Sequence, residues 1–388
     1  VNALRILVVP FVVASVIVGI AALANIGRVN RAIGKSLLYF GVTSLIAVII
    51  GYALVEIIQP GAGIGTMGAT APAELTRVTS FTFNQVLSSI LPESLLGATA
   101  QGNLLGLVIF ALFIGATVIV LEARGKAVVD FFGSLNEVLS RLIQLVLYAA
   151  PVGLLFLVGA AVAQNAHSSS NMVSSVGLFS LTVLAAVVIH GLVILPLALK
   201  ILGKRDFWSY LGSTAPALFT AFGTGSPVAT LPITVNSVVK AGNVDSRAGS
   251  VALPLGSLIN MNGTALYLVI GAFFCAQVFQ VDLSIFQIVG LVAMAFLLSI
   301  AASLIPHGSL LILGVLLYSV SFPIEAYAAI GLILVVDWFF ERLRATLNVW
   351  GDAVGAAVIA ETFEFKTARR VTSSDGPRRQ RPTKRSDS

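Results

Sequence analysis

Long apolar runs dominate the chain and recur from its first residues to about residue 361. Each of the principal runs holds roughly 20 or more mostly apolar residues, the length that a helix needs to cross a ~30 Å hydrocarbon layer. We place these runs at 4–25, 36–58, 103–122, 139–162, 177–201, 251–279 and 324–361. They predict an all-α integral membrane protein with about seven transmembrane helices.

Two further apolar stretches are interrupted by glycine and proline and do not fit as ordinary spans. They are "LFTAFGTGSPVATLPIT" (218–234) and "SIAASLIPHGSLLILGVLLYSVSFP" (299–323). Irregular backbone at membrane depth persists only where protein or a water-filled cavity surrounds it. We therefore predict two re-entrant helical hairpins, near 208–239 and 286–322, a pattern typical of transporter binding sites. Two kinked spans are the alternative.

Basic residues concentrate in alternate connections between the apolar runs. They cluster at 28–35, 124–126, 200–205, 240–247 and 366–388, whereas the intervening connections hold one arginine at most. Cytoplasmic loops of membrane proteins carry the excess of Lys and Arg. The pattern predicts a multi-pass protein of the cell membrane with a cytoplasmic C-terminus, and kinked spans in place of the hairpins would break the alternation.

Composition supports the prediction of a membrane protein and limits the kinds of partner that it can have. Charged residues make up 10% of the 388 and hydrophobic residues 57%. The net charge of +6 is accounted for by residues 366–388, which hold eight basic and two acidic residues. We expect 363–388 to be a disordered basic tail that is attracted to anionic lipid, and we do not predict nucleic-acid binding. The single cysteine, Cys275, excludes an internal disulfide.

Five polar residues follow one helical face of the last apolar run. They are spaced 4, 3, 4 and 4 residues apart, at Asp337, Glu341, Arg344, Asn348 and Asp352. At about 100° per residue they fall within an arc of about 80°. Each ion facing lipid would cost roughly 2.5–3.5 kcal/mol, so this polar stripe must face protein or water. Arginine suits a carboxylate and a deep aspartate suits a small cation, so the stripe predicts an anionic solute that moves with a cation; a purely structural ion pair is the alternative.

A second polar stretch, "LINMNGTALYLVI" (258–270), lies inside another apolar run. Asn260, Asn262 and Gly263 are costly within a membrane helix unless they have a function there. We predict that the helix unwinds at this point and that its carbonyls and amide side chains become oxygen ligands opposite Asp352.

These motifs resemble the dicarboxylate/amino acid:cation symporters, a family that includes archaeal aspartate and mammalian glutamate transporters. "NMNGTALY" (260–267) is similar to the family's NMDGT signature, and the last run is similar to its D-x3-D-x2-R-T-x2-N-V-x-G-D pattern. "ATLP" (229–232), "LLYFGVTS" (37–44) and "PGAGI" (60–64) resemble further family motifs in the same order. The resemblance covers essentially all of residues 1–362.

The resemblance implies a homotrimer whose protomers each hold a fixed scaffold and a transport domain that moves across the membrane like an elevator. It implies scaffold helices at 1–27 and 58–171, and a transport domain formed by 28–57 and 172–362. Family members have eight spans and two hairpins, and by this resemblance we expect the chain to begin inside the second span and to lack the first. The resemblance also implies that the second hairpin closes over the site from outside.

The resemblance further implies residues for a solute site. Arg344 would bind the side-chain carboxylate of the solute, and Thr264 would assist it. Glu341 would face an amino group, Asn348 would contact both solute and cation, and Ser226 would lie at the tip of the first hairpin.

Two cation sites are implied in the same way. One would combine the backbone carbonyls of Gly256, Asn260 and Asn348 with the carboxylate of Asp352. The other would draw on the residues Tyr39, Thr43, Ser44, Asn260 and Asn262. No further cofactor is expected, and the coupled cation is expected to be Na+, with H+ the alternative.

The chain departs from the family pattern at several of these positions. Asn262 stands where the family has Asp, Glu341 replaces Asp, Ala345 replaces Thr, and Pro227 stands where a carboxylate-binding serine is expected. A plain C4-dicarboxylate is therefore as plausible a solute as glutamate or aspartate. The predicted function is secondary active symport and not catalysis, and the alternative is an uncoupled anion channel or a transporter-like receptor. An intramembrane protease built on Ser226 with His190 or His307 is the rival among enzymes.

Overall fold

The computed structural model describes residues 2–21, 30–62, 94, 97–98, 104–139, 141–142, 145, 169–302, 308–319, 322, 326 and 328–362. Within these residues the regular structure is entirely helical, which confirms the all-α prediction. The basic tail at 363–388, most of the predicted span at 139–162 and the motif "PGAGI" after residue 62 lie outside the described residues.

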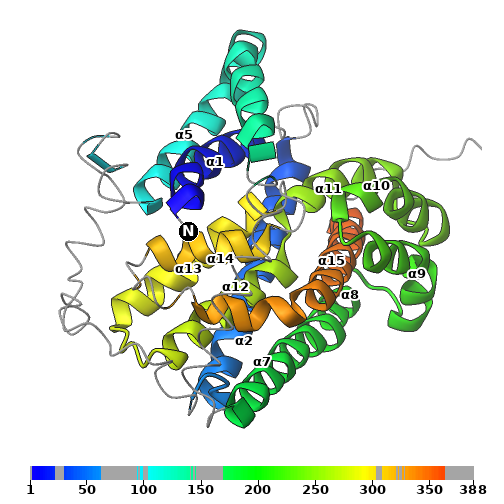
Figure 1. The fold of residues 1–388 in the computed structure, drawn as a ribbon. Coiled ribbons are helices and arrows are strands. Elements are labelled where there is room, and N and C mark those ends of the chain that lie inside the picture. The colour runs from blue at the N-terminus through cyan, green and yellow to red at the C-terminus, as the bar shows by residue number, and fades with distance from the viewer. Residues whose placement is uncertain are drawn as a thin grey trace, which may run out of the picture.

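The N-terminal third contributes two packed helices and one helix that joins the rest of the bundle. α1 (Asn2–Ala21) packs against α5 (Leu104–Leu121), and both lie at one side of the molecule (Figure 1). α5 continues through the short 3-10 turn Glu122–Gly125 into a helix over 126–139. α2 (Asn30–Ile58) packs instead on α7, α11 and α12. The division into scaffold and transport domain stays a prediction.

A long helix with one internal irregularity follows. α7 (Ser169–Ile189) passes through a π-helical segment, His190–Ile194, into α8 (Leu195–Ile201). The indole N–H of Trp350 donates to the carbonyl of Gly191 at 2.9 Å, which connects the π-helical segment to the C-terminal helix. A π-helical turn frees carbonyls from the regular ladder, so this one can accept a bond from a neighbouring helix.

The first predicted hairpin is present as two packed helices. α9 (Phe207–Thr224) and α10 (Pro227–Val235) meet at a tight turn, after which a π-helical segment covers Asn236–Ala241. Gly225 turns the chain with φ of 65°, a left-handed conformation that suits glycine. The hydroxyl of Ser226 then accepts the N–H of Ala229 and caps α10, whose first residue is Pro227.

The second predicted hairpin is also formed by two helices that pack together. α13 (Ile285–Ala302) and α14 (Ser309–Ser319) lie beside α12. The tip between them, 303–307, lies outside the described residues. Its predicted closure over the site therefore stays a prediction.

Three helices form the interior of the bundle. α11 (Ser246–Ile259) and α12 (Asn262–Val278) are the two halves of one broken span, and both pack on α15 (Ala328–Thr362). Side chains of α12 are almost entirely buried from Asn262 to Ala276. The predicted break at 258–270 is confirmed, because helix ends at Ile259 and resumes at Asn262.

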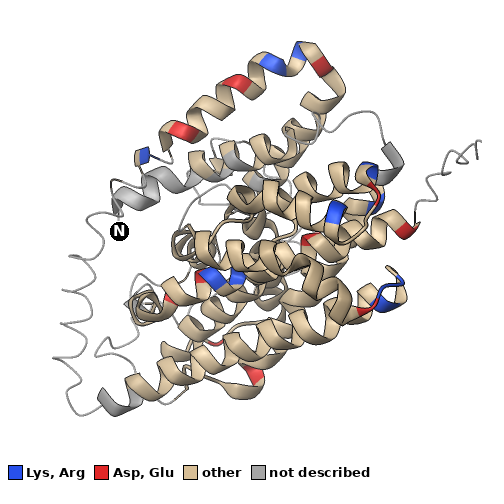
Figure 2. Cartoon of the chain, turned by 90° about the vertical axis from the view of Figure 1, so that its right-hand side faces the viewer, with Lys and Arg blue, Asp and Glu red and all other residues tan. Residues whose placement is uncertain are grey.

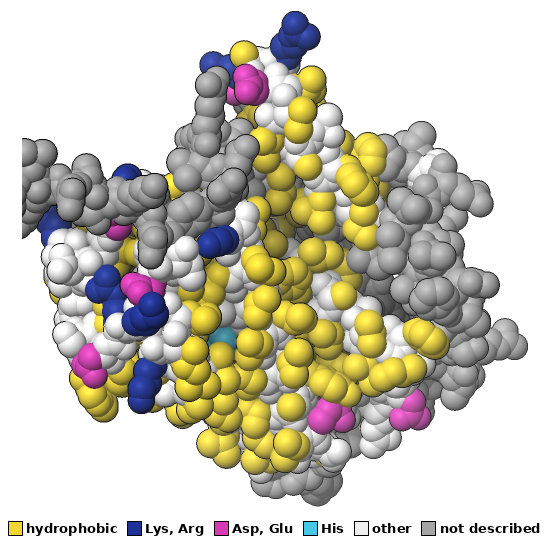
Figure 3. Space-filling model, turned by 180° about the vertical axis from the view of Figure 1, so that it is seen from behind, with side chains coloured by type: hydrophobic (Ala, Val, Ile, Leu, Met, Phe, Trp, Pro, Cys, Tyr) yellow, Lys and Arg dark blue, Asp and Glu magenta, His cyan; other side chains and the backbone are white. Residues whose placement is uncertain are grey.

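The surface is that of a membrane protein. In the described part of the chain, four helical stretches are apolar and long enough to cross a bilayer: Ile33–Ile58, Met172–Ile201, Ser246–Val278 and Ile285–Ala302. Large apolar side chains such as Ile57, Phe219 and Val335 are 78%, 78% and 79% exposed. Figure 3 shows a broad hydrophobic surface on one face of the molecule, which is typical of a surface that contacts lipid.

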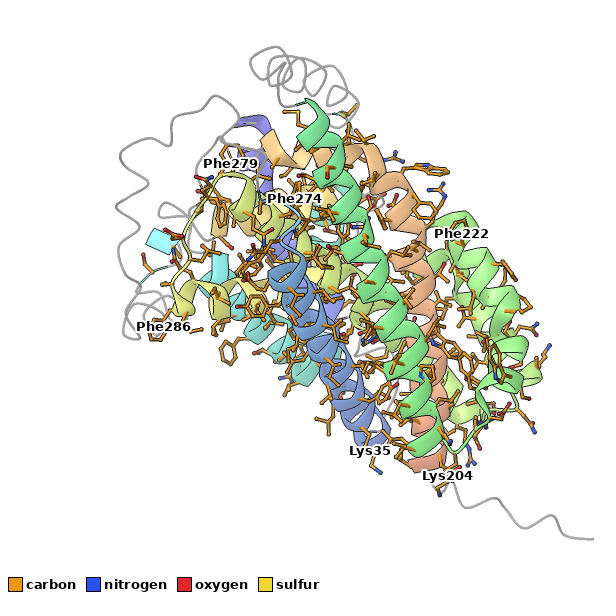
Figure 4. All side chains as sticks on the ribbon, turned by 90° about the horizontal axis from the view of Figure 1, so that it is seen from below. Lys35, Lys204, Phe222, Phe274, Phe279 and Phe286 are labelled. Carbon is orange, nitrogen blue, oxygen red and sulfur yellow. The ribbon has the colours of Figure 1, made fainter. Side chains whose placement is uncertain are left out.

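Charged residues gather at loops and helix ends, apart from those on α15 and those along the helix over 126–139 (Figure 2). Lys35 and Lys204 lie at one end of the bundle, and Phe279 lies at the opposite end (Figure 4). At the first end, Lys204 forms a 2.8 Å salt bridge with Glu361, and the ammonium of Lys35 donates to the carbonyl of Thr362. Two of the predicted cytoplasmic loops therefore meet the C-terminal end of α15.

Candidate functional site

The break between α11 and α12 brings an irregular turn into the centre of the bundle. Asn260 (φ −82°, ψ 68°) and Met261 (φ −95°, ψ 48°) leave helical geometry. The turn is closed by backbone bonds from Asn260 N–H to Gly256 O at 2.8 Å and from Met261 N–H to Ile259 O at 2.9 Å. Asn260 and Asn262 are both fully buried, so their side chains must find partners within the protein.

The polar stripe of α15 faces this turn. The amide of Asn260 donates to the carboxylate of Asp352 at 2.9 Å, and the N–H of Gly263 donates to the Asn348 side chain at 2.8 Å. The amide nitrogen of Asn348 lies 3.4 Å from the Thr264 hydroxyl. The structure therefore brings the polar stripe of α15 into contact with the turn between α11 and α12, as predicted.

Glycines on both sides allow this close approach. A Cβ on Gly263 would lie 2.8 Å from Cα of Arg344, and one on Gly351 would lie 2.6 Å from the amide nitrogen of Asn260. A Cβ on Gly256 would meet the carboxylate of Asp352. α11 and α12 can therefore lie this close to α15 only because these three positions carry no side chain.

Arg344 is held by its neighbours in the N-terminal part of the stripe. Its Nη2 forms a 3.0 Å salt bridge with Asp337, its Nε donates to Phe340 O at 3.2 Å, and its guanidinium carbon lies 3.9 Å from the ring centre of Tyr267. Nη1 is buried and has no hydrogen-bond partner among the described residues. The arginine keeps one donor group for an anion.

Asp352 occupies the other end. The residue is 2% exposed, and the contact described for its carboxylate is the neutral amide of Asn260. Within the described residues it forms no salt bridge. A buried carboxylate without a cationic partner is costly, and a bound cation would neutralise it.

The second predicted cation group is also assembled around the turn. The hydroxyl of Ser44 donates to Asn262 Oδ1 at 2.6 Å, and that of Thr43 donates to the carbonyls of Tyr39 and Phe40 at 3.0 and 3.2 Å. The Thr43 hydroxyl lies 3.4 Å from Asn260 Oδ1. Among the described residues, the Tyr39 hydroxyl and the Asn262 amide nitrogen are buried without a partner. The oxygens present are hard ligands suited to a small cation.

The first hairpin reaches the stripe through its tip. A Cβ on Gly225 would lie 3.8 Å from Cγ of Glu341, so the turn that carries Ser226 contacts α15. Ser226 and Glu341 are both half-buried there. The Ser226 hydroxyl caps α10, while both nitrogens of the buried His190 have no partner within the described residues, so those two do not form a nucleophile–base pair. His307 lies outside these residues.

Sequence reasoning placed Asp337 on the stripe but gave it no role, and it gave none to Tyr267 or Met261. Asp337 is the salt-bridge partner of Arg344, and the hydroxyl of Tyr267 donates to the same carboxylate oxygen at 2.6 Å. The sulfur of Met261 accepts the amide of Asn348 at 3.3 Å. Helical spacing carried a signal for Asp337 alone, because it precedes Arg344 by two turns of the same helix and so lies on the same face.

A helical membrane protein with a broken span, a hairpin tip and a charged stripe meeting in its interior belongs to the class of ion- and solute-binding membrane proteins. Comparison with known proteins narrows the class. The description "Sodium:dicarboxylate symporter family" applies to a profile that matches residues 1–362, and the chain belongs to that family. The family is one of transporters, not enzymes.

Individual relatives agree. The chain is 33% identical to Excitatory amino acid transporter 1 of Ambystoma tigrinum over 92% of its length and 74% of that protein. It is 36% identical to the human Excitatory amino acid transporter 1 over 72% of its length, which spans only 50% of that protein. It is 31% identical to the human Neutral amino acid transporter B(0) over 96% of its length and 74% of that protein.

Proposed function

We propose that the protein is a secondary active symporter that carries an acidic amino acid or a C4-dicarboxylate across the membrane together with Na+. One observation carries the proposal: a buried guanidinium lies two turns from a buried carboxylate on one face of α15, against the broken span, and that carboxylate has no salt bridge within the described residues. Residues Arg344 and Asp352 supply these charges, and both are 2% exposed. Such a pair is suited to one anion and one cation.

The solute site that we propose is centred on Arg344. Its free Nη1 would donate to a carboxylate, and charge-assisted bonds of this kind are about twice as strong as neutral ones. Thr264 at the start of α12 and Asn348, one turn after Arg344 on α15, would add neutral contacts, and their side chains lie 3.4 Å apart. Ser226 and Glu341 would meet the solute from the hairpin side, and an amino group there would face the carboxylate of Glu341.

The cation sites that we propose use the turn and its neighbours. Asp352, the Asn260 carbonyl group and the Gly256 and Asn348 backbone carbonyls would surround one cation. Tyr39, Thr43, Ser44, Asn260 and Asn262 would form a second, neutral site. Since Asn262 carries no charge, we expect that site to bind its cation weakly or not at all.

The wider mechanism rests on the family. We propose an elevator movement in which α2 and residues 172–362 cross the membrane as one body, within a homotrimer, with the C-terminus in the cytoplasm. The clustering of Lys35, Lys204 and the end of α15 supports that orientation. A neutral amino acid is the less favoured solute, because it would bring no side-chain carboxylate to Nη1 of Arg344, which is buried without a partner among the described residues.

Uptake into proteoliposomes tests the proposal. Radiolabelled aspartate, glutamate and succinate are offered under an inward Na+ gradient, a pH gradient or neither. We expect accumulation above equilibrium with Na+, and loss of uptake in Arg344→Ala with unchanged insertion. Equilibration without accumulation would establish the uncoupled channel, and gradient-driven uptake of a neutral amino acid alone would refute the substrate assignment.

A further inference from the structure

The guanidinium of Arg344 is already neutralised by a group of its own helix. Its Nη2 lies 3.0 Å from Asp337 Oδ1, and the side chains of Arg344 and Asp337 are 2% and 10% exposed. The Tyr267 hydroxyl donates to the same oxygen at 2.6 Å, and the ring of Tyr267 lies beneath the guanidinium. One aromatic residue of α12 therefore fixes both ions of the pair.

The pair does not occupy the whole arginine. Nε binds the carbonyl of Phe340, Nη2 binds Asp337, and Nη1 has no partner among the described residues. A solute carboxylate can approach Nη1 without breaking the salt bridge. Because Asp337 and Arg344 are separated by two turns of α15, the pair also stays together whenever that helix moves.

We propose that Asp337 is the internal counter-ion of Arg344, a positioning residue that keeps the guanidinium neutralised while no solute is bound and so allows the empty carrier to return across the membrane. The inference rests on the proposed transport function. A single ion in hydrocarbon surroundings is costly, and removing one member of a buried pair leaves the other uncompensated. If residue 337 is neutral, the carboxylate of a bound solute at Nη1 still compensates the guanidinium, whereas the empty carrier has no such charge.

Two transport modes separate these states. Exchange of internal for external solute uses only the loaded carrier, whereas net uptake also needs the empty carrier to return. Neutralising residue 337 should therefore slow net uptake and spare exchange. The affinity for solute should rise as well, because the guanidinium is no longer neutralised by Asp337 and the negative charge of Asp337 no longer repels the solute carboxylate.

The test compares the unsubstituted protein with Asp337→Asn, Tyr267→Phe and Asp337→Glu in proteoliposomes. Asp282→Asn is the matched control, since it makes the same chemical change in an exposed loop. Labelled aspartate is measured in exchange mode, with unlabelled aspartate and Na+ inside, and in net mode, with neither inside. For Asp337→Asn we expect net uptake to fall about ten-fold or more, exchange to stay within about two-fold, and half-saturating aspartate in exchange to decrease.

Tyr267→Phe keeps the ring and removes one hydrogen bond to Asp337, so its ratio of net uptake to exchange should fall by a smaller factor. Asp337→Glu should recover much of the net uptake. Parallel loss of both modes in Asp337→Asn, or an unchanged ratio, would overturn the counter-ion role. If Asp337→Asn does not insert, an unchanged ratio in Tyr267→Phe has the same meaning. A parent that transports aspartate in neither mode would instead overturn the proposed function.

Discussion

Gly351→Ala should weaken cation binding without harming the helix that carries it. Gly351 lies within α15, where alanine is favoured over glycine by about 1 kcal/mol. The added Cβ would, however, lie 2.6 Å from the amide nitrogen of Asn260 and 2.8 Å from that of Asn262, and contacts under 3.0 Å are essentially absent for real Cβ atoms. Both amides must therefore move.

The cost can be estimated from the bond that is disturbed. Asn260 donates to the Asp352 carboxylate at 2.9 Å, and hydrogen bonds to charged groups contribute about 1.5–3 kcal/mol. Since about 1.4 kcal/mol changes an equilibrium constant ten-fold, displacement of Asn260 should lower Na+ affinity by roughly ten- to hundred-fold. Solute contacts at Arg344 lie two turns away and are affected less directly.

The assay is a Na+ titration of the melting temperature of the purified protein, with and without aspartate. Gly212→Ala is the control, because a Cβ at that glycine of α9 would meet nothing within 4 Å. We expect the Gly351→Ala curve to shift to higher Na+ and the Gly212→Ala curve to coincide with the parent. An unshifted Gly351→Ala curve would refute the assignment of a cation site to the turn at Asn260.

Three further changes test separate parts of the structure. Arg344→Ala should abolish binding of acidic solutes while the Na+-dependent rise in melting temperature persists, and retained aspartate binding by calorimetry would contradict this. Asn262→Asp should lower the half-saturating Na+ concentration, by roughly ten-fold if the new charge contributes about 1.4 kcal/mol; an unchanged titration would mean that residue 262 is not a ligand. Asp245 caps α11 outside the membrane, and its hydrogen bond with Arg247 holds its pKa below the usual value. Asp245→Ala should cost about 1 kcal/mol at pH 7 and Asp245→Asn much less. The pKa of Asp245 is lower in the folded than in the unfolded protein, so its charge stabilises the fold at pH values above the unfolded pKa. This stabilisation is lost as the pH falls through the folded pKa. The difference in stability between the unsubstituted protein and Asp245→Asn should therefore shrink in acid.

The lengths of the apolar runs, and the Gly and Pro residues that interrupt them, predicted most of the helices of the bundle. Pro227 and Gly225 mark the first hairpin in the sequence, and the structure places its turn at those residues. Helix ends were less predictable: α2 begins at Asn30, earlier than the apolar run at 36, because Lys35 and its neighbours extend the helix beyond the hydrocarbon layer. Composition alone cannot locate such polar extensions.

The site could be predicted where spacing on one element determines it. The stripe from Asp337 to Asp352 followed from helical periodicity alone. Contacts between elements could not be derived in that way, because the pairing of Tyr267 with Asp337 depends on how α12 is rotated against α15. The neutralisation of Arg344 by Asp337 was likewise one of several pairings that the stripe permitted.

The spacing along α15 constrains how solute and cation can influence each other. Arg344 and Asp352 are eight residues apart, about 12 Å along a helix, so the solute and the cation that we propose for them need an intermediary. Asn348 lies one turn from each and binds the N–H of Gly263, directly beside the turn that Asn260 completes. A ligand at either end that orders this turn lowers the cost of ordering it for the other. Since such coupling is reciprocal, any factor by which Na+ raises aspartate affinity must equal the factor by which aspartate raises Na+ affinity.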